Sequence, residues 1–232
     1  MEFIGFSRKA IPFLKQIKNN NNKEWFLAHK SEYEELILNP CRAFVVEMGE
    51  HLQALEPTVN AVPKINGSLF RIYRDIRFSH NKTPIKTTIG IIFWQGKAKR
   101  LQSSHFYLHF SIDELFVAVG IRWFEKPLLD AYREYIKDET KRVELDGILQ
   151  NLLKLGYTTI PKEYKRYPKG FNKDMKSAYL SLYKGMAAYK ILEPSLIQNG
   201  EKLIDTLYKI YEDMLILQQW MYKMTLSVKE VD

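Results

Sequence analysis

The sequence has a single cysteine and lacks any run of about 18 apolar residues, the length that a membrane-spanning helix needs. Cys41 cannot form an intrachain disulfide and lacks the partner spacing of a metal site, so the cysteine content is typical of a reducing compartment. Where a signal peptide needs an apolar stretch, the chain has the charged sequence MEFIGFSRKAIPF. We therefore expect a cytoplasmic protein without a membrane partner.

Common catalytic and metal-binding motifs are also absent. The chain has no HExxH, paired CxxC or EF-hand spacing, and no P-loop, GxGxxG turn or GxSxG elbow. His105 and His109 are four residues apart on an expected strand, which separates them by roughly 13 Å and prevents them from sharing a metal. We therefore predict no metal site and no cofactor, and the commonest nucleotide-binding and hydrolase classes are excluded.

The positive charge is concentrated in two regions of the chain, whose formal net charge is +8. Residues 64–104 contain nine Lys or Arg residues and one acidic residue, and residues 161–190 contain eight and two. The remainder of the chain is net negative. This uneven distribution favours a localised anion site. The alternative is that the basic regions lie against acidic helices in an internal charge network.

The segment from Ser68 to Thr88, called the signature segment below, alternates cations with core-type side chains. Charges placed between apolar residues must meet carboxylates, backbone carbonyls or a bound anion, because an unpaired buried charge is costly. The cations that we predict to bind an anionic ligand are Arg71, Arg74, Arg77, Lys82 and Lys86.

Asp75 is the only acidic residue of the signature segment. If the segment is a strand, Arg71, Tyr73, Asp75 and Arg77 project from one side and Arg74 from the other. Neighbouring guanidinium groups would keep Asp75 ionised, which makes it a weak general base and suits it to holding an arginine in place. We include Asp75 in the predicted ligand site.

The motif RIYRD-x-RFS-xx-K-x-P-x-KT in this segment resembles the signature of an uncharacterised conserved-hypothetical family, a domain of unknown function. The similarity extends to NNNKEWF at residues 20–26, FYLHF at residues 106–110 and YPKGF at residues 167–171. This resemblance implies one globular domain and no known reaction.

The periodicity of apolar residues predicts an α+β fold. Residues 7–56 show the three- and four-residue spacings of helices, and residues 66–124 are rich in β-branched and aromatic residues. Residues 127–226 predict further helices and a basic, tyrosine-rich loop. We therefore predict one domain, residues 1–232, in which N-terminal and C-terminal helices pack on an antiparallel sheet of about four or five strands. Heptad spacing in the expected last helix, residues 195–224, leaves a monomer and a dimer open.

A two-residue turn at Asp113 and Glu114 would place His109 opposite Ala118 and assign a face to every residue of the two flanking strands. One face is apolar core. The other face carries His105, Tyr107, His109, Phe116, Ala118, Gly120 and Arg122. Because the small residues would leave room above the sheet, we predict that this face is the floor of a groove. Arg122 is a further predicted ligand residue. His109 is the best acid-base candidate, followed by Tyr107, because imidazole titrates near neutrality.

Basic and aromatic residues also alternate around YPKGF, so Lys169 is a candidate lid residue. The leading hypothesis is recognition of a small phosphorylated or carboxylated ligand in a basic cleft. One alternative is an enzyme that acts on a phosphoester or similar anion, with His109 or Tyr107 transferring the proton. Nucleic-acid binding and a purely structural network of arginines and Asp75 also stay open.

Overall fold

The fold is that of a computed structural model, which describes residues 3–227. The helices are α1 (Ala10–Asn19), α2 (Lys23–Ala28), α3 (Lys30–Tyr33), α4 (Asn39–Leu55), α5 (Lys126–Tyr135), α6 (Glu139–Lys154), α7 (Gly200–Asp213) and α8 (Leu215–Thr225), with a π-helical turn η1 (Glu34–Leu38) and 3-10 turns η2 (Ala178–Leu182) and η3 (Pro194–Gln198). The strands are β1 (Val59–Asn60), β2 (Ile89–Gln95), β3 (His105–Phe110), β4 (Leu115–Ile121), β5 (Thr158–Thr159) and β6 (Met186–Leu192). They form one antiparallel sheet in the order β1-β2-β3-β4-β6-β5, which confirms the predicted α+β class.

The chain divides into two compact units, and β2, β3 and β4 contribute residues to both. Unit 1 comprises residues 1–93, 107–117 and 191–209, and unit 2 comprises the remainder. The ends of the predicted domain 1–232 lie outside the described residues, and its single-domain character stays a prediction. Within the described part of the chain, no helix is long and apolar enough to cross a membrane.

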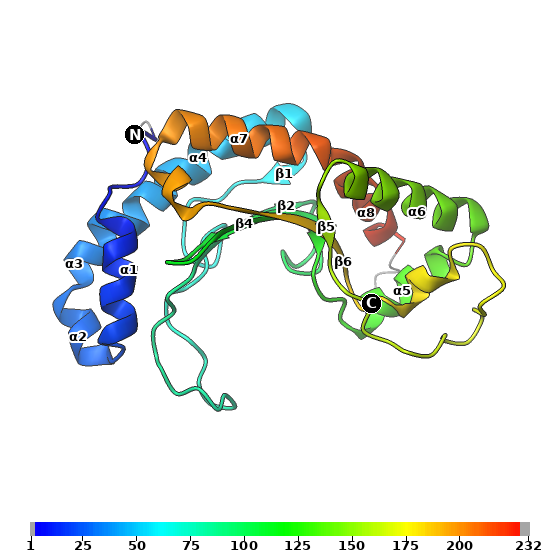
Figure 1. Ribbon diagram of the computed structural model, residues 1–232, viewed down its shortest axis with the longest axis horizontal. Helices are drawn as coiled ribbons and strands as arrows, with labels where there is room; N and C mark the ends of the chain where they lie inside the picture. The colour runs from blue at the N-terminus through cyan, green and yellow to red at the C-terminus, as the bar shows by residue number, and fades with distance from the viewer. Residues whose placement is uncertain (1–2, 228–232) are drawn as a thin grey trace. The chain divides into compact units, whose positions relative to one another are not determined.

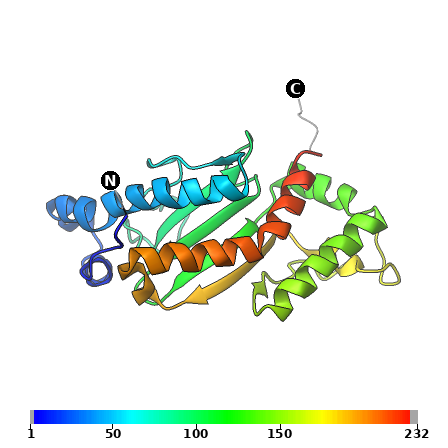
Figure 2. The same cartoon turned by 90° about the horizontal axis from the view of Figure 1, so that it is seen from above.

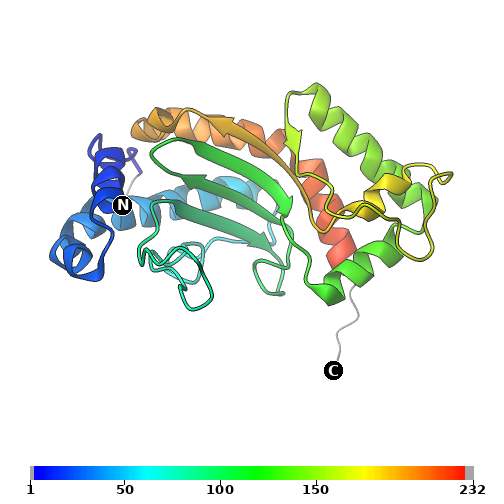
Figure 3. The same cartoon turned by 60° about the horizontal axis from the view of Figure 1, so that its bottom comes forward.

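In unit 1, helices cover one face of the strands. Figure 2 shows α4 and α7 side by side over the strands, and the rings of His51 and Tyr208 join these helices with centroids 5.8 Å apart. Phe44 on α4 is fully buried against Phe93 on β2. Figures 1 and 3 show the signature segment on the opposite face of these strands. That face is therefore free of the two long helices.

In unit 2, helices α5 and α6 both pack on α8. Arg142 on α6 is only 1% exposed, and its guanidinium donates to the carbonyls of Ile136 at 2.8 Å and Lys176 at 2.6 Å. The buried charge is thus solvated by backbone oxygens, which ties the end of α5 to the segment before η2.

The sheet has six strands, whereas four or five were predicted. The additional strands β5 and β6 lie in residues 127–226, which were expected to hold helices and a loop. The sequence MAAYKIL of β6 is a short apolar run, and such a run does not distinguish strand from helix by periodicity. The expected last helix is likewise interrupted, because Met214 separates α7 from α8 with φ −92° and ψ 2°.

The prediction that the signature segment continues as a strand is wrong. From residue 70 to residue 88 the backbone is irregular apart from isolated bridges. Side chains satisfy the backbone locally: Asp75 accepts the N–H of Arg77 at 3.2 Å, and Asn81 accepts the N–H of Thr83 at 3.0 Å. Such bonds compete with strand pairing. The alternate projection of Arg71, Tyr73, Asp75 and Arg77 from a strand therefore does not apply.

The hairpin between β3 and β4 has a register that differs from the prediction by two residues. The N–H of Ser111 donates to the carbonyl of Glu114 at 2.9 Å, so Ile112 and Asp113 form the centre of the turn. The shift keeps every residue of β3 and β4 on its predicted face, because the period of a strand is two. The residue opposite His109 is therefore Phe116 and not Ala118. The rings of His109 and Phe116 stack with their centroids 4.9 Å apart.

His105 on β3 makes the stability of the fold depend on pH. It is 7% exposed, and its Nδ1 lies 2.8 Å from the Ser103 carbonyl, which accepts only when Nδ1 carries hydrogen. Burial lowers the pKa of His105 from 6.5 to about 4. Between these values the unfolded chain binds the proton and the folded chain does not. This group's contribution to the free energy of unfolding is therefore lost as the pH falls from about 6.5 to about 4.

We predict that His105 destabilises the protein by about 2 kcal/mol when the pH falls from 7 to 5. Urea unfolding at the two pH values measures the loss in the wild type, and His105→Asn should show a smaller loss by that amount. The exposed His80 provides the control, because His80→Asn should retain the wild-type pH dependence. An identical pH dependence in His105→Asn and wild type would contradict the prediction.

Candidate functional site

The signature segment is held in place by the side chain of Asn21. Its Nδ2 donates to the carbonyl of Ile85 at 2.9 Å, and its Oδ1 accepts the N–H of Ile85 at 3.0 Å. One amide thereby satisfies both backbone groups of Ile85. The next residue, Asn22, caps α2 by accepting the N–H of Trp25 at 2.8 Å.

The two arms of the segment also pair with each other. The N–H of Arg74 donates to the Pro84 carbonyl, and the N–H of Lys86 donates to the Ile72 carbonyl, both at 2.8 Å. These bonds flank Ile85 without using its own N–H and carbonyl. Asn21 therefore supplies the hydrogen-bond partners for the backbone of Ile85 that the pairing of the arms does not provide.

Asp75 holds Arg77 through two hydrogen bonds. Nε and Nη2 of Arg77 donate to the two carboxylate oxygens at 3.0 and 2.7 Å. The hydrogen bonds from Arg77 hold the pKa of Asp75 well below its usual range, and Asp75 in turn raises the pKa of Arg77. The Arg77 side chain is nevertheless 76% exposed. An exposed pair of this kind adds little to stability.

Two further cations of the signature segment contact uncharged groups. Lys82 donates to the Ile76 carbonyl at 3.0 Å, and Nη1 of Arg74 donates to the Thr83 hydroxyl at 3.1 Å. Within residues 3–227, Arg74 forms no ion pair with a carboxylate. The internal charge network predicted as an alternative thus covers Arg77 and leaves Arg74 without a counter-charge.

The cations nearest the sheet differ in their surroundings. The Lys86 ammonium lies 5.8 Å from the centre of the Phe70 ring, within cation-π range. Arg71 is exposed, and among the described residues it also lacks an ion pair. The base of the segment is therefore positively charged beside an aromatic ring.

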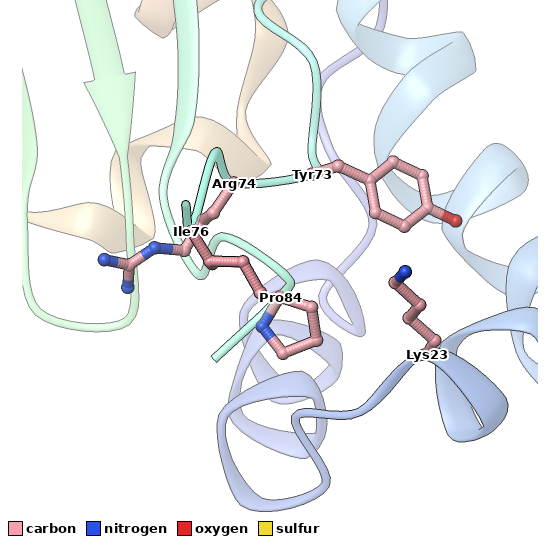
Figure 4. Close-up of a pocket in the computed structure, with 5 residues that line it drawn as sticks. All are labelled: Lys23, Tyr73, Arg74, Ile76 and Pro84. Atoms are coloured by element: carbon pink, nitrogen blue, oxygen red, sulfur yellow. The ribbon is translucent and has the colours of Figure 1, made fainter. Parts of the chain in front are cut away.

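A pocket of about 380 Å³ lies beside the signature segment, called the Lys23 pocket below. Its lining residues are Lys23, Tyr73, Arg74, Ile76 and Pro84. Figure 4 shows the Lys23 ammonium and the Tyr73 hydroxyl pointing toward one another, while the guanidinium of Arg74 points away from both. In the described part of the chain Lys23 has no carboxylate partner. The pocket therefore offers an ammonium and a hydroxyl beside apolar walls.

Four rings gather on the face of the unit 1 strands that α4 and α7 leave free. This ring cluster consists of Phe70, Tyr107, His109 and Phe116, all partly exposed. Tyr107 lies 6.0 Å from Phe70 and 6.3 Å from Phe116 between ring centroids. His109 lies nearly parallel to Phe116, with an interplanar angle of 9°. The cluster is a continuous aromatic surface.

Glu114 orients His109 within the ring cluster. Nε2 of His109 and Oε1 of Glu114 are 3.0 Å apart, and the histidine side chain is 18% exposed. Tyr107 lies beside His109, with centroids 5.6 Å apart. The structure thus places the two predicted acid-base residues together and adds a carboxylate that fixes the imidazole.

The part of the predicted groove floor that lies in unit 2 is closed. A Cβ on Gly120 would lie 2.2 Å from the Met186 carbonyl oxygen, and φ is +122°. Gly120 therefore allows β6 to approach β4 closely and leaves no room for a ligand. Ala118 is buried at 8% exposure. The idea that these small residues open a groove is wrong.

Arg122 and Lys169 belong to unit 2, and both are exposed there. Arg122 follows β4, and Lys169 lies in the irregular segment between β5 and η2. Neither lines the Lys23 pocket. Their contacts with a ligand stay predictions.

Sequence reasoning missed Asn21, Lys23 and Glu114 as site residues. The first two stand in NNNKEWF, one of the motifs that carried the family resemblance, so that signal was available. Nothing in the sequence indicated a role for Glu114, because the residue was assigned to the turn between the two strands. Among residues 3–227, no three His, Cys, Asp or Glu side chains are arranged to hold a metal ion.

A comparison with protein families gives a match over most of the chain. A family model described as "conserved hypothetical protein (DUF2461)" matches residues 9–220, which agrees with the resemblance seen in the sequence motifs. No curated protein matches the chain. The description of the family names no activity.

Replacing Asn21 should loosen the signature segment while leaving the helices intact. We predict that Asn21→Ala lowers the free energy of local opening around Ile85 by about 2 kcal/mol, because it removes two partly buried hydrogen bonds. Amide hydrogen exchange of Ile85 should accelerate roughly 30-fold. Asn20→Ala is the matched control, because the Asn20 side chain only donates to the Gln16 carbonyl on an exposed surface. Unchanged exchange of Ile85 in Asn21→Ala would contradict the role of this clamp.

Proposed function

We propose a function for this chain, which belongs to the DUF2461 family of conserved hypothetical proteins: it binds a small phosphorylated or carboxylated ligand in the Lys23 pocket. The observation that carries the proposal is the Lys23 ammonium, which faces the Tyr73 hydroxyl across the pocket and has no carboxylate partner among the described residues. An ammonium and a hydroxyl that converge on one space are suited to the oxygens of an anion.

The pocket walls support the same ligand class. Ile76 and Pro84 contribute apolar surface beside the two donors, and hydrogen bonds to a charged group are stronger where water is reduced. The volume of about 380 Å³ is near the lower end of ligand pockets, which span roughly 300 to 1,000 Å³. A small molecule with one anionic group fits this space better than a polymer does.

The charge of the signature segment supports attraction of an anion toward the pocket. Asp75 compensates Arg77, and Arg71 and Arg74 have no carboxylate partner in the part of the chain that the structure describes. The segment therefore presents net positive charge beside the pocket. Such a field raises the local concentration of anions and their rate of association.

Lys23→Met should weaken anion binding without unfolding the protein. We predict a loss of affinity for inorganic phosphate of at least tenfold, because a charge-assisted hydrogen bond contributes about 1.5–3 kcal/mol. The dependence of the thermal unfolding midpoint on phosphate concentration, at constant chloride, gives the affinity.

The control for Lys23→Met is Lys18→Met, which removes the same charge from the exposed surface of α1. Lys18→Met should bind phosphate as the wild type does. Equal affinities of Lys23→Met and Lys18→Met would contradict the proposal, as would a wild type whose midpoint does not respond to phosphate.

A second candidate function is an enzyme that acts on a phosphoester or a similar anionic substrate. The hydrogen bond between His109 and Glu114 favours it, because a carboxylate that fixes an imidazole is a recurrent arrangement in acid-base catalysis. In this version His109 transfers the proton, and nearby cations stabilise the charge that develops on the substrate.

The enzymatic candidate predicts that His109→Asn reduces kcat by roughly 100-fold or more, the usual contribution of a general acid or base. Hydrolysis of p-nitrophenyl phosphate by the purified protein is the measurement. Glu114→Gln should give a smaller loss, and His80→Asn, which changes an exposed histidine, should give none. Absence of turnover in the wild type, or full turnover in His109→Asn, would remove this candidate.

A further inference from the structure

The ring cluster lies on the face of the unit 1 strands that α4 and α7 do not cover. The alternate residues of β3 explain the placement: Phe106, Leu108 and Phe110 are buried in the core, while Tyr107 and His109 are partly exposed on the other face. Phe70, from the start of the signature segment, extends this face beyond the hairpin.

The rings of Phe70 and Tyr107 pack closely on β2 because residue 90 is a glycine. A Cβ at this position would lie 3.1 Å from the Phe70 ring and 3.1 Å from the Tyr107 hydroxyl oxygen, which is tighter than ordinary contact. Because residue 90 is glycine, both side chains can approach the strand closely, with their rings nearly perpendicular to each other at 83°. The result is a group of partly exposed rings at the base of the signature segment.

Positive charge borders this surface on one side. The Lys86 ammonium lies 5.8 Å from the centre of the Phe70 ring, and the exposed Arg71 follows Phe70 directly. The carboxylate of Glu114 at the other side of the cluster is engaged by His109. A ligand that matches this arrangement has a planar ring and a negative group at one end.

We infer that the ring cluster is a second binding surface, which takes a nucleoside monophosphate with its base against the rings and its phosphate toward Lys86. Stacking on aromatic side chains suits a base, because every base has a π-face, and Lys86 supplies charge complementarity for the phosphate. This surface shares no residue with the Lys23 pocket, so the inference stands independently of the function proposed above.

The size of the surface favours a free nucleotide over a nucleic-acid strand. The cluster contains four rings, and two of them, His109 and Phe116, already stack on each other. A strand needs a succession of separate stacking positions along a charged groove. A single base with one phosphate uses the cluster and Lys86 and needs no further contacts.

The test compares AMP with ribose 5-phosphate, which carries the same phosphate and sugar without the base. We expect the wild type to bind AMP at least tenfold more tightly, measured by isothermal titration calorimetry at constant salt. Phe116→Leu, which keeps apolar volume and removes the ring, should bring the two affinities within about threefold of each other. NMR provides a second measurement, because ring currents should shift the adenine protons upfield in the complex.

Two variants serve as controls. Phe78→Leu changes a ring that is 95% exposed and lies outside the cluster, so it should keep the preference for AMP. Lys23→Met should keep it as well, whatever happens to phosphate binding in the Lys23 pocket. If Phe116→Leu fails to fold, Phe70→Leu replaces it, with the same expected loss of preference.

Four results would overturn the inference. Equal affinities of the wild type for AMP and ribose 5-phosphate would show that the rings do not take a base, and would leave the Lys23 pocket proposal untouched. A preference for AMP that survives both Phe116→Leu and Phe70→Leu, or disappears in Lys23→Met, would place the base elsewhere. Binding of a short single-stranded oligonucleotide without binding of AMP would make the partner a strand.

Discussion

The double hydrogen bond between Asn21 and the backbone of Ile85 is the contact on which the candidate site depends. The signature segment has no regular strand structure, so its arms are positioned by few bonds. Asn21 holds the residue after Pro84, while its neighbour Asn22 caps the helix that begins with Lys23. The same turn therefore sets both sides of the Lys23 pocket, and the pocket exists because two adjacent asparagines have different partners.

Charge in the signature segment is divided between internal pairing and exposure to the surroundings. Arg77 has Asp75 as a counter-ion within two residues, and Lys82 is held by a backbone carbonyl. Arg71, Arg74 and Lys86 add further positive charge to the segment, and Lys23 lies beside it. A segment of this composition tolerates its own repulsion because most of it lies in water, where interactions between charges are weak. Because the segment is exposed, the repulsion between its cations costs little free energy.

The sequence predicted local features better than long-range ones. The core face of the hairpin follows from the alternation of neighbouring residues, and the structure agrees with it. The strand β6 and the hairpin register depend on partners that propensity does not specify. In the site, composition identified the cations, but Lys23 could not be paired with Tyr73, because only the fold brings these distant residues to one pocket.

The tip of the signature segment carries a feature with a practical consequence for protein engineering. Phe78 is 95% exposed and lies between the two arms of the segment. The arms are joined by the backbone bonds from Arg74 to Pro84 and from Lys86 to Ile72. Cutting or extending the chain beside Phe78 would break none of these pairs and would leave the contacts of Asn21 in place. Exposed loop tips of this kind tolerate new termini and inserted domains. The protein could thus be labelled with a fluorescent domain next to its own candidate ligand site.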